Sequence, residues 1–401
     1  MRDTALDASG SVFDAAEFAE RHRRVREQME AERLDALIAY SNAAVTGCVQ
    51  YLSGYFSRQM GSQSRADGSY YTYGGGALLL PLDGEPTLVT DQLWDVERAQ
   101  STSVISETIA AEDFASELGP RIATAGYERV GIDTWPIFPA PSYLSLRELA
   151  RAAEFVPTRL IDEVRRTKSL AEIALIRKAE DAAVGAVEKA TDLVAVGIGD
   201  FELVRAAEDA LREFGDIETP GPSIVFAGPR TASSSGAPTR DDSYEMQRGD
   251  WAMFDLTPAY EGYAGDVCRM RVAGKPSDLD PELARLYDAT LKINEGVIEA
   301  IRPGAIPADL DALALSIADE AGFAENKLGL TGHGLGLDMH EAPDYYYDRC
   351  PLEPGMVFTV EPCLVIPDVA GVRIEDVVLV TENGCEVLSE ASPKQLRGSE
   401  D

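Results

Sequence analysis

Four carboxylates occur in segments of the sequence that are otherwise apolar. They lie in WAMFDL, GDVCRMRV, MVFTVEP and RIEDVVLV, at Asp255, Asp266, Glu361 and Glu375. A carboxylate that is buried without a partner costs several kcal/mol or takes up a proton. Four such groups therefore require positive charge close to them.

Two of the three histidines of the chain share one glycine-rich segment, TGHGLGLDMHEAP, as His333 and His340. Glycines at 332, 334 and 336 argue against a helix and predict a tight strand or turn whose backbone passes close to another segment. We expect His333 to be a metal ligand and His340 to be an active-site group. The third histidine, His22 in RHRRVR, is expected on the charged face of a helix, solvated or stacked on a cation.

A pair of divalent cations would supply the charge that the carboxylates require. Hard divalent cations bind carboxylate oxygens, and two ions about 3.5 to 4 Å apart can share bridging carboxylates. One imidazole in such a site suits Mn, Fe, Co or Zn better than Ca. The structural alternative is a set of buried ion pairs with Arg269, Arg271 and Arg373, which lie near the carboxylates in sequence.

An internal repeat indicates how these residues are positioned. Residues 197–215 and 304–322 each run from glycine to glycine over 19 positions, and each predicts a helix with a left-handed C-terminal cap. Chance similarity between two amphipathic helices is the alternative. Adding the 107-residue offset to 255 and 266 gives 362 and 373, within two residues of Glu361 and Glu375. The carboxylates would then occupy pseudo-symmetric positions.

Other patterns predict the elements around the repeat. Within residues 248–274, apolar and polar side chains alternate, a turn containing Pro and Gly follows, and the alternation then resumes, as in a hairpin. A long helix is expected after Ser169, because Glu172 completes a capping box and apolar residues then recur at helical spacing. Before it, helix-like and strand-like stretches alternate and predict an α/β domain, with a long loop over residues 51–76. The predicted domains are residues 1–157 and 158–401.

Composition limits the partners and the location. The chain of 401 residues has a formal charge of -33, and only seven of its basic residues are lysine. Such self-repulsion is screened at high salt, so we interpret the composition as adaptation to a salt-rich cytoplasm, with an ordinary acidic protein as the alternative. In either case we expect neither nucleic acid nor membrane as partner. There is no run of about 18 apolar residues and no secretory signal pattern. The five scattered cysteines are expected to be small buried residues rather than disulfides or zinc ligands.

Four segments, in their order and separations, resemble the pita-bread-fold metallopeptidase family of methionine aminopeptidase, prolidase and aminopeptidase P. They are GDWAMFDLTPAYEGYAGDVCR, TGHGLGLDMHEAP, MVFTVEPCL and GVRIEDVVLV. The region before them is similar to that of the prolidase, aminopeptidase P and creatinase branch. The resemblance implies a creatinase/prolidase-type α/β domain, then a duplicated, pseudo-two-fold α+β catalytic domain, in a homodimer.

The resemblance also implies a dinuclear metal-dependent peptidase. A hydroxide between two divalent ions (Mn, Co, Fe or Zn) would hydrolyse the N-terminal or Xaa-Pro bond of short peptides. Matched position by position, the implied metal ligands are Asp255 on one ion, His333 and Glu361 on the other, and Asp266 and Glu375 bridging both. Glu361 would also transfer the proton, His340 would donate to the developing oxyanion, and Arg373 would orient the carboxylates.

Two departures from the family pattern affect the substrate. The family's usual histidine before the first ligand strand has Ser235 as its nearest match in AGPRTASSSGAPTRDD, and the aminopeptidase P histidine four residues before His333 is Gly329. A creatinase-like C–N hydrolase or a metal-dependent lyase acting on a small organic solute therefore stays open as an alternative. A non-catalytic binding protein on the same fold is a third.

Overall fold

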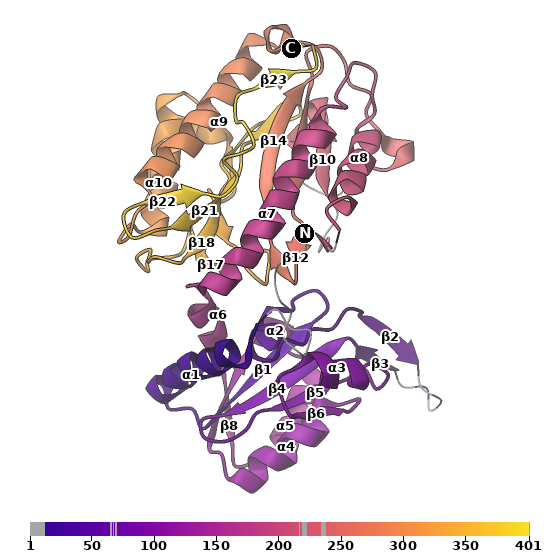
Figure 1. The fold of residues 1–401 in the computed structure, drawn as a ribbon, viewed down its shortest axis with the longest axis vertical. Helices are drawn as coiled ribbons and strands as arrows, with labels where there is room; N and C mark the ends of the chain where they lie inside the picture. The colour runs from indigo at the N-terminus through magenta and orange to yellow at the C-terminus, as the bar shows by residue number, and fades with distance from the viewer. Residues whose placement is uncertain are drawn as a thin grey trace. The chain divides into compact units, whose positions relative to one another are not determined.

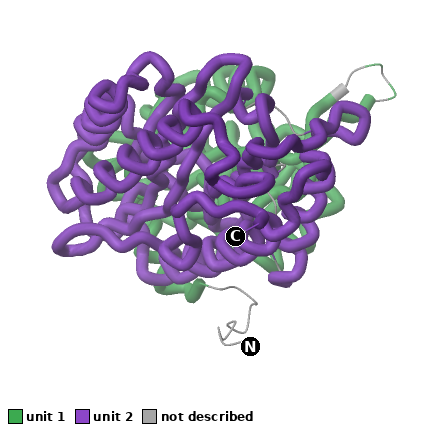
Figure 2. Tube along the Cα trace, turned by 90° about the horizontal axis from the view of Figure 1, so that it is seen from above, with its two compact units in different colours: residues 1–165 green, residues 166–401 purple. Residues whose placement is uncertain are grey.

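The computed structural model describes residues 13–64, 66, 68, 70–215, 217–218, 223–233 and 238–400. The chain divides into two compact units, residues 1–165 and 166–401 (Figure 2). The domain boundary expected between residues 157 and 158 falls just before the last helix of the first unit, and it stays a prediction.

The first unit is built around a mixed six-stranded sheet. Its strands, in spatial order, are β6 (Glu107–Ala110), β5 (Thr87–Thr90), β4 (Gly75–Pro81), β1 (Ala36–Asn42), β7 (Arg129–Asp133) and β8 (Glu154–Thr158). β1 runs antiparallel to β4 and parallel to β7. The helices are α1 (Ala15–Glu32), α2 (Gly47–Ser53), α3 (Val96–Thr102), α4 (Phe114–Ala125), α5 (Ala140–Leu149) and α6 (Leu160–Arg165), with the short 3-10 helix η1 (Trp135–Ile137) (Figure 1).

The apolar run of β1 reflects burial on both faces of this sheet. Ile38 and Tyr40 share a buried cluster with Phe114 and Ile122 of α4. Leu37, which precedes Ile38 in the strand, is also fully buried and faces the opposite side. Strands covered on both faces show continuous apolar runs instead of alternation. The predicted α/β character of this unit is confirmed.

The long loop predicted for residues 51–76 is partly wrong. Helix α2 extends to Ser53, and β2 (Gly61–Ser64) pairs antiparallel with β3 (Tyr70–Tyr73). The ladder forms between backbones, and the small polar residues of β2 do not show the apolar alternation that marks a half-buried strand.

The second unit has two halves, each with a pair of helices against a mainly antiparallel sheet. The first half contains α7 (Leu170–Thr191), α8 (Asp200–Arg212) and the sheet β10 (Ile224–Ala227), β11 (Trp251–Leu256), β14 (Val267–Val272) and β23 (Arg397–Gly398), in which β23 runs parallel to its neighbour β14. The second half contains α9 (Pro281–Ala300), α10 (Pro307–Glu320) and the sheet β17 (Glu341–Asp344), β16 (His333–Gly334), β18 (Val357–Val360), β21 (Asp376–Val380) and β22 (Cys385–Val387). α7 packs on β11 and β14, whereas α9 packs on β18 (Figure 1).

The predicted repeat corresponds to α8 and α10. Both glycines of each copy take positive φ: Gly197 and Gly304 at 89° and 86°, and Gly215 and Gly322 at 86° and 81°. Positive φ is the conformation that glycine permits and other residues avoid. Equal backbone geometry at both ends of both copies supports duplication over chance similarity.

The two halves join through the strands that carry the acidic residues. Cys268 in β14 and Glu375, just before β21, form an antiparallel bridge in which the Glu375 amide donates to the Cys268 carbonyl at 3.2 Å. The predicted hairpin over 248–274 is present as β11 paired antiparallel with β14. The expected capping box of α7 also forms between Ser169 and Glu172.

Smaller elements complete the second unit. The short sheets are β13 (Tyr263–Ala264), β12 (Ala259–Tyr260) and β9 (Ile217–Glu218), and β15 (Lys327–Leu328), β19 (Cys363–Ile366) and β20 (Ala370–Arg373). The 3-10 helices are η2 (Gly228–Ala232), η3 (Arg240–Asp242), η4 (Pro276–Asp278) and η5 (Ala324–Asn326). Within the described ranges, no helix is both long and apolar enough to cross a membrane.

Two residue-level expectations need correction. None of the five cysteines is in a disulfide, but Cys350 is exposed and Cys385 is only half-buried, so not all of them are buried. His22 is half-buried rather than solvated, with its Nε2 2.7 Å from the carbonyl oxygen of Leu52. The charge of neighbouring arginines marked the helix face but did not indicate this backbone partner.

Candidate metal centre

The four carboxylates come from the strands of both halves of the second unit. Asp255 lies in β11, and Asp266 directly precedes β14. Glu361 directly follows β18, and Glu375 directly precedes β21. The pairing of β11 with β14 and of β18 with β21, together with the bridge at Glu375, brings the four strands to one place.

Three of the expected ligands form a compact buried cluster. Asp266, His333 and Glu375 each offer one ligand atom, and these atoms all lie within 4.8 Å of one another. Glu361 adjoins the cluster, because its Oε1 is 3.3 Å from His333 Nε2, whereas Asp266 Oδ2 is 3.9 Å from the same nitrogen. The structure therefore brings these four side chains together.

Asp255 is linked to this group of side chains by the side chain of Arg373. The Arg373 guanidinium forms a close ion pair with Asp255, and its Nε lies 3.6 Å from Glu361 Oε2. The other arginines of the alternative interpretation pair with other carboxylates: Arg269 with Asp376 at 2.8 Å and Arg271 with Asp192 at 3.9 Å. Among the described residues, Arg373 is the one arginine whose guanidinium pairs with these carboxylates, which leaves the cluster short of positive charge.

Glu375 shows this shortage most clearly. Both of its carboxylate oxygens are buried, and no hydrogen-bond donor among the described residues reaches either of them. Buried polar atoms almost always have partners. Two buried carboxylate oxygens within reach of another carboxylate and an imidazole are a donor set that fits a divalent cation.

His333 is oriented for the same purpose. Its Nδ1 lies 3.0 Å from the carbonyl oxygen of Gly334, and since that oxygen can only accept, Nδ1 carries the proton. Burial lowers the pKa of His333, which favours the neutral ring. The unprotonated Nε2 then points at carboxylate oxygens, an arrangement that a cation between them makes favourable. Metal-binding histidines commonly donate their other N–H to a backbone carbonyl in this way.

The protonation behaviour of the carboxyls agrees with crowded negative charge. Burial, then the neighbouring Asp255, raises the pKa of Asp266 well above its usual range. Burial, then Asp266, does the same to the pKa of Glu375. Burial raises the pKa of Glu361 to about 7, although Arg373 opposes the shift. These groups resist ionisation unless a cation compensates them.

The glycines around His333 allow the close backbone approach that the sequence predicted. A Cβ on Gly332 would lie 2.0 Å from the carbonyl oxygen of Thr359, and one on Gly334 would lie 2.4 Å from the Ala342 backbone. The His333 amide donates to the Thr359 hydroxyl at 3.2 Å. A side chain at Gly332 would push this segment away from β18, and one at Gly334 would push it away from β17.

His340 stands at the accessible side of the cluster. The residue is exposed to solvent on one side, and its ring meets the His333 ring edge-on, with 4.0 Å between the ring centroids. Partial burial of the ring and the neighbouring His333 lower the pKa of His340, so it is neutral near pH 7. A neutral imidazole at this position can donate one hydrogen bond to a group that enters from solvent.

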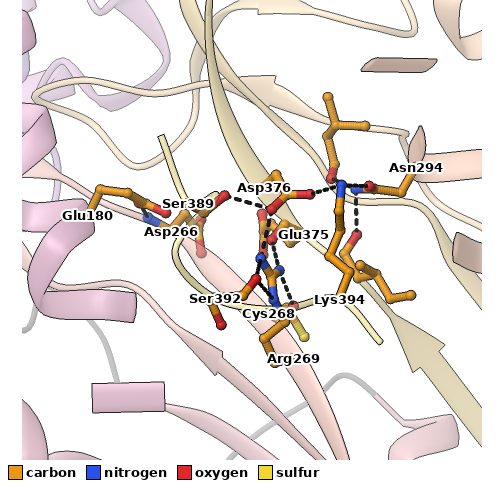
Figure 3. A network of polar contacts seen from close by, with 12 residues as sticks. Glu180, Asp266, Cys268, Arg269, Asn294, Glu375, Asp376, Ser389, Ser392 and Lys394 are labelled. Carbon is orange, nitrogen blue, oxygen red and sulfur yellow. Dashed lines mark hydrogen bonds and ion pairs between the residues drawn. The ribbon is translucent and has the colours of Figure 1, made fainter. Parts of the chain in front are cut away.

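Two buried residues near the site were not identified from the sequence. Glu180 of α7 accepts the Asp266 amide at 2.8 Å (Figure 3), and burial raises its pKa to about 8. Lys168 forms a buried ion pair of 2.6 Å with Glu341, which follows His340. Glu180 follows Ala179 and is buried on the apolar side of its helix. An acidic residue at such a position is a signal that could have identified Glu180 from the sequence.

Of the two positions that depart from the family pattern, the structure describes only Gly329. Ser235 lies outside the described residues. Gly329 has a φ of 68° and open space where a Cβ would stand. The backbone there takes a left-handed conformation that most residues with side chains rarely adopt.

Known families cover both units of the chain. Residues 174–382 match the model of metallopeptidase family M24, and residues 21–167 match that of the Creatinase/Prolidase N-terminal domain. An uncharacterised peptidase of Staphylococcus epidermidis is 31% identical over 319 residues, which cover 78% of this chain and 87% of that protein. An uncharacterised peptidase of Staphylococcus haemolyticus is 37% identical, but the match spans only 57% of this chain and 64% of that protein.

Solved structures show the same architecture. An Xaa-Pro dipeptidase from Bacillus anthracis is 27% identical with a TM-score of 0.77, and the match covers 95% of this chain and 99% of that one. A prolidase from Pyrococcus horikoshii is 28% identical with a TM-score of 0.77, covering 92% and 98%. The predicted pita-bread fold after a creatinase-type domain is confirmed. Since the first family model spans more than half of the sequence, the chain belongs to metallopeptidase family M24 and is a metal-dependent peptidase.

Proposed function

We propose that this chain is a dinuclear metallopeptidase that hydrolyses the Xaa-Pro or N-terminal bond of short peptides. The observation that carries the proposal is Glu375, whose two buried and unpartnered oxygens lie in a cluster with Asp266 and His333. Similarity to solved structures described as an Xaa-Pro dipeptidase and a prolidase supports the choice of substrate.

The donor set divides between two cations. Asp255, Asp266, His333, Glu361 and Glu375 would together hold these ions. When bound, the ions would lower the pKa of a coordinated water and polarise the scissile carbonyl. Mn, Co, Fe or Zn would suit a site of four carboxylates with one imidazole.

The side chains around the ions would handle protons and developing charge. Glu361 would accept a proton from the nucleophile and pass it to the leaving nitrogen. His340, neutral and exposed, would donate a hydrogen bond to the carbonyl oxygen as that oxygen becomes negative. Arg373 contacts both Asp255 and Glu361, so it would hold these two carboxylates in fixed orientations.

The assembly and the setting stay predictions. We expect a homodimer from the family resemblance, and a salt-rich cytoplasm from the net charge of -33. A peptide or small-molecule substrate, with neither nucleic acid nor membrane, completes the expected set of partners.

The test is an assay of protein purified in high salt and loaded with Mn²⁺ or Co²⁺. Ala-Pro, a longer Xaa-Pro peptide and a peptide without proline would be compared by kcat/KM. We expect turnover of at least one Xaa-Pro peptide and loss of turnover with a chelator. Absence of peptide turnover with either metal would remove the proposal.

A paired variant locates the activity at the cluster. Glu375→Gln should lower the bound metal and reduce kcat/KM by more than the roughly 10- to 100-fold that loss of a supporting residue costs. The control is Glu386→Gln, since Glu386 lies in the same half in an exposed ion pair with Arg177. Equal metal content in wild type and Glu375→Gln would place the site elsewhere.

A second candidate activity is favoured by Gly329, which stands where the aminopeptidase P branch has a histidine four residues before His333. The same centre could then cleave a C–N bond of a small organic solute, or act as a lyase on one. Small amides and sulfonium solutes assayed beside the peptides separate the two activities. Bound metal near zero and a melting temperature unchanged by added metal would instead indicate a non-catalytic binding protein.

A further inference from the structure

A buried side chain links the backbone segments that lead to two of the proposed ligands. Asn294 of α9 donates its Nδ2 to the carbonyl oxygens of Val360 at 3.0 Å and Ile374 at 3.3 Å. Val360 and Ile374 immediately precede Glu361 and Glu375. One amide therefore ties together the two strands at the residues next to these ligands.

Lys394, close to the C-terminus, fixes the orientation of that amide. Its Nζ donates to Asn294 Oδ1 at 2.9 Å and lies 3.1 Å from Asp376 Oδ2 (Figure 3). An ammonium group can only donate, so it holds the oxygen of Asn294 toward itself. The Nδ2 is thereby directed at the two backbone carbonyls.

Arg269 secures the same region from β14. Its guanidinium donates to the Glu375 carbonyl at 2.5 Å, to the Cys268 carbonyl at 2.9 Å and to Asp376 Oδ1 at 2.8 Å. It also donates to the Ser392 carbonyl at 2.9 Å. The backbone of Glu375 is thus held on both sides, since its amide already donates to Cys268.

The C-terminal segment 389–394 closes the network. Ser389 donates its hydroxyl to Asp376 at 2.6 Å, and Ser392 and Lys394 make the contacts described above (Figure 3). Buried charged networks are often no more stabilising than apolar packing of the same volume. Added stability therefore does not by itself explain why two positively charged side chains and a carboxylate are buried here. A requirement for fixed backbone geometry does explain it.

We propose that Asn294 and Lys394 are positioning residues of the metal centre, which set the separation and direction of Glu361 and Glu375. The C-terminal segment would then act as a clamp on the centre from outside it. This inference rests on the proposed function, because it requires cations at the two glutamates.

The test uses Co²⁺ binding to the full-length protein, because the visible absorption of Co²⁺ reports its coordination geometry. Asn294→Asp keeps the shape of the side chain but turns the donor into an acceptor facing two carbonyl oxygens. Lys394→Met removes the charge at a side chain that is only partly buried, and Lys394→Arg restores it. The matched control is Asn326→Asp, since Asn326 Nδ2 also donates to a strand carbonyl, that of Val365, in a strand without proposed ligands.

We expect Asn294→Asp and Lys394→Met to bind Co²⁺ about 10-fold or more weakly than wild type and to shift its spectrum. Lys394→Arg and Asn326→Asp should match wild type, even where the control lowers the melting temperature. Wild-type affinity and spectrum in either Asn294→Asp or Lys394→Met would overturn the proposal, and the partly exposed Lys394 keeps the test usable if Asn294→Asp does not fold. Failure of the wild type to bind Co²⁺ would instead remove the metal centre itself.

Discussion

Protonation links the individual carboxyls to the metal centre. Asp266 and Glu375 are buried beside each other, and Glu361 adjoins them through His333. Each ionised group raises the cost of ionising the next, so their protons leave in coupled steps. A cation that binds to such a cluster competes directly with these protons.

We therefore expect metal binding to release protons, and to release fewer as pH rises. The pKa of Glu361 is about 7 and those of Asp266 and Glu375 are raised well above their usual range. At about pH 6 the cluster holds protons that a cation must displace, whereas above about pH 8 Glu361 is already ionised. Titration calorimetry with Mn²⁺ in buffers of different ionisation enthalpy measures the number released. An apparent enthalpy independent of the buffer near pH 6 would contradict this expectation.

At the scale of elements, the approach of β16 to β18 depends on residues without side chains. Gly332→Ala should displace β16, because the new Cβ would lie 2.0 Å from the Thr359 carbonyl oxygen. We expect lower melting temperature and loss of metal binding, since His333 follows directly. Gly384→Ala is the control, as nothing lies within 4 Å of its Cβ position. A Gly332→Ala protein with wild-type metal stoichiometry would show that this backbone contact is not required.

The ion pair between Lys168 and Glu341 supports the segment that carries His340. Both side chains are nearly inaccessible, at 1% and 3% exposure. Removing one partner of a buried pair leaves an uncompensated charge, so Lys168→Met should lower the free energy of unfolding by about 3 to 5 kcal/mol. Chemical denaturation of the metal-free protein measures this loss.

Two further variants distinguish the effect of burial on the free energy of unfolding from the effect of ion pairing alone. Lys168→Met combined with Glu341→Gln should recover part of the stability, because no charge is then left unpaired. Arg177→Met breaks an exposed pair with Glu386 and should cost no more than about 1 kcal/mol. Equal losses in Lys168→Met and Arg177→Met would mean that burial of the first pair has no energetic consequence.

At the scale of the whole molecule, the net charge of -33 opposes the compact state. Salt screens this repulsion, and the Debye length falls from about 10 Å at 0.1 M to about 3 Å at 1 M. We expect the melting temperature to rise steeply with KCl up to about 1 M and then to level off as screening becomes complete. Differential scanning calorimetry over this range measures the change. A melting temperature that is independent of KCl would contradict the interpretation of salt adaptation.

Local patterns in the sequence were sufficient to predict several parts of the fold. The capping box at Ser169 and Glu172 and the positive φ of Gly215 and Gly322 depend on neighbouring residues, so they could be predicted. The alternation of β11 and β14 likewise indicated a hairpin. The β2 and β3 ladder was missed because its pairing carries no apolar alternation.

The sequence by itself determined which residue types could form a metal centre, because carboxylates in apolar strands and a histidine between glycines are costly or unusual without a ligand. Only the tertiary structure decided their partners: Arg373 beside Asp255, and the Asp266 amide on Glu180. It also decided that Asn294 supports both glutamate strands. Caps and periodicity arise from residues a few positions apart, whereas these contacts join segments far apart in the chain, which periodicity does not specify.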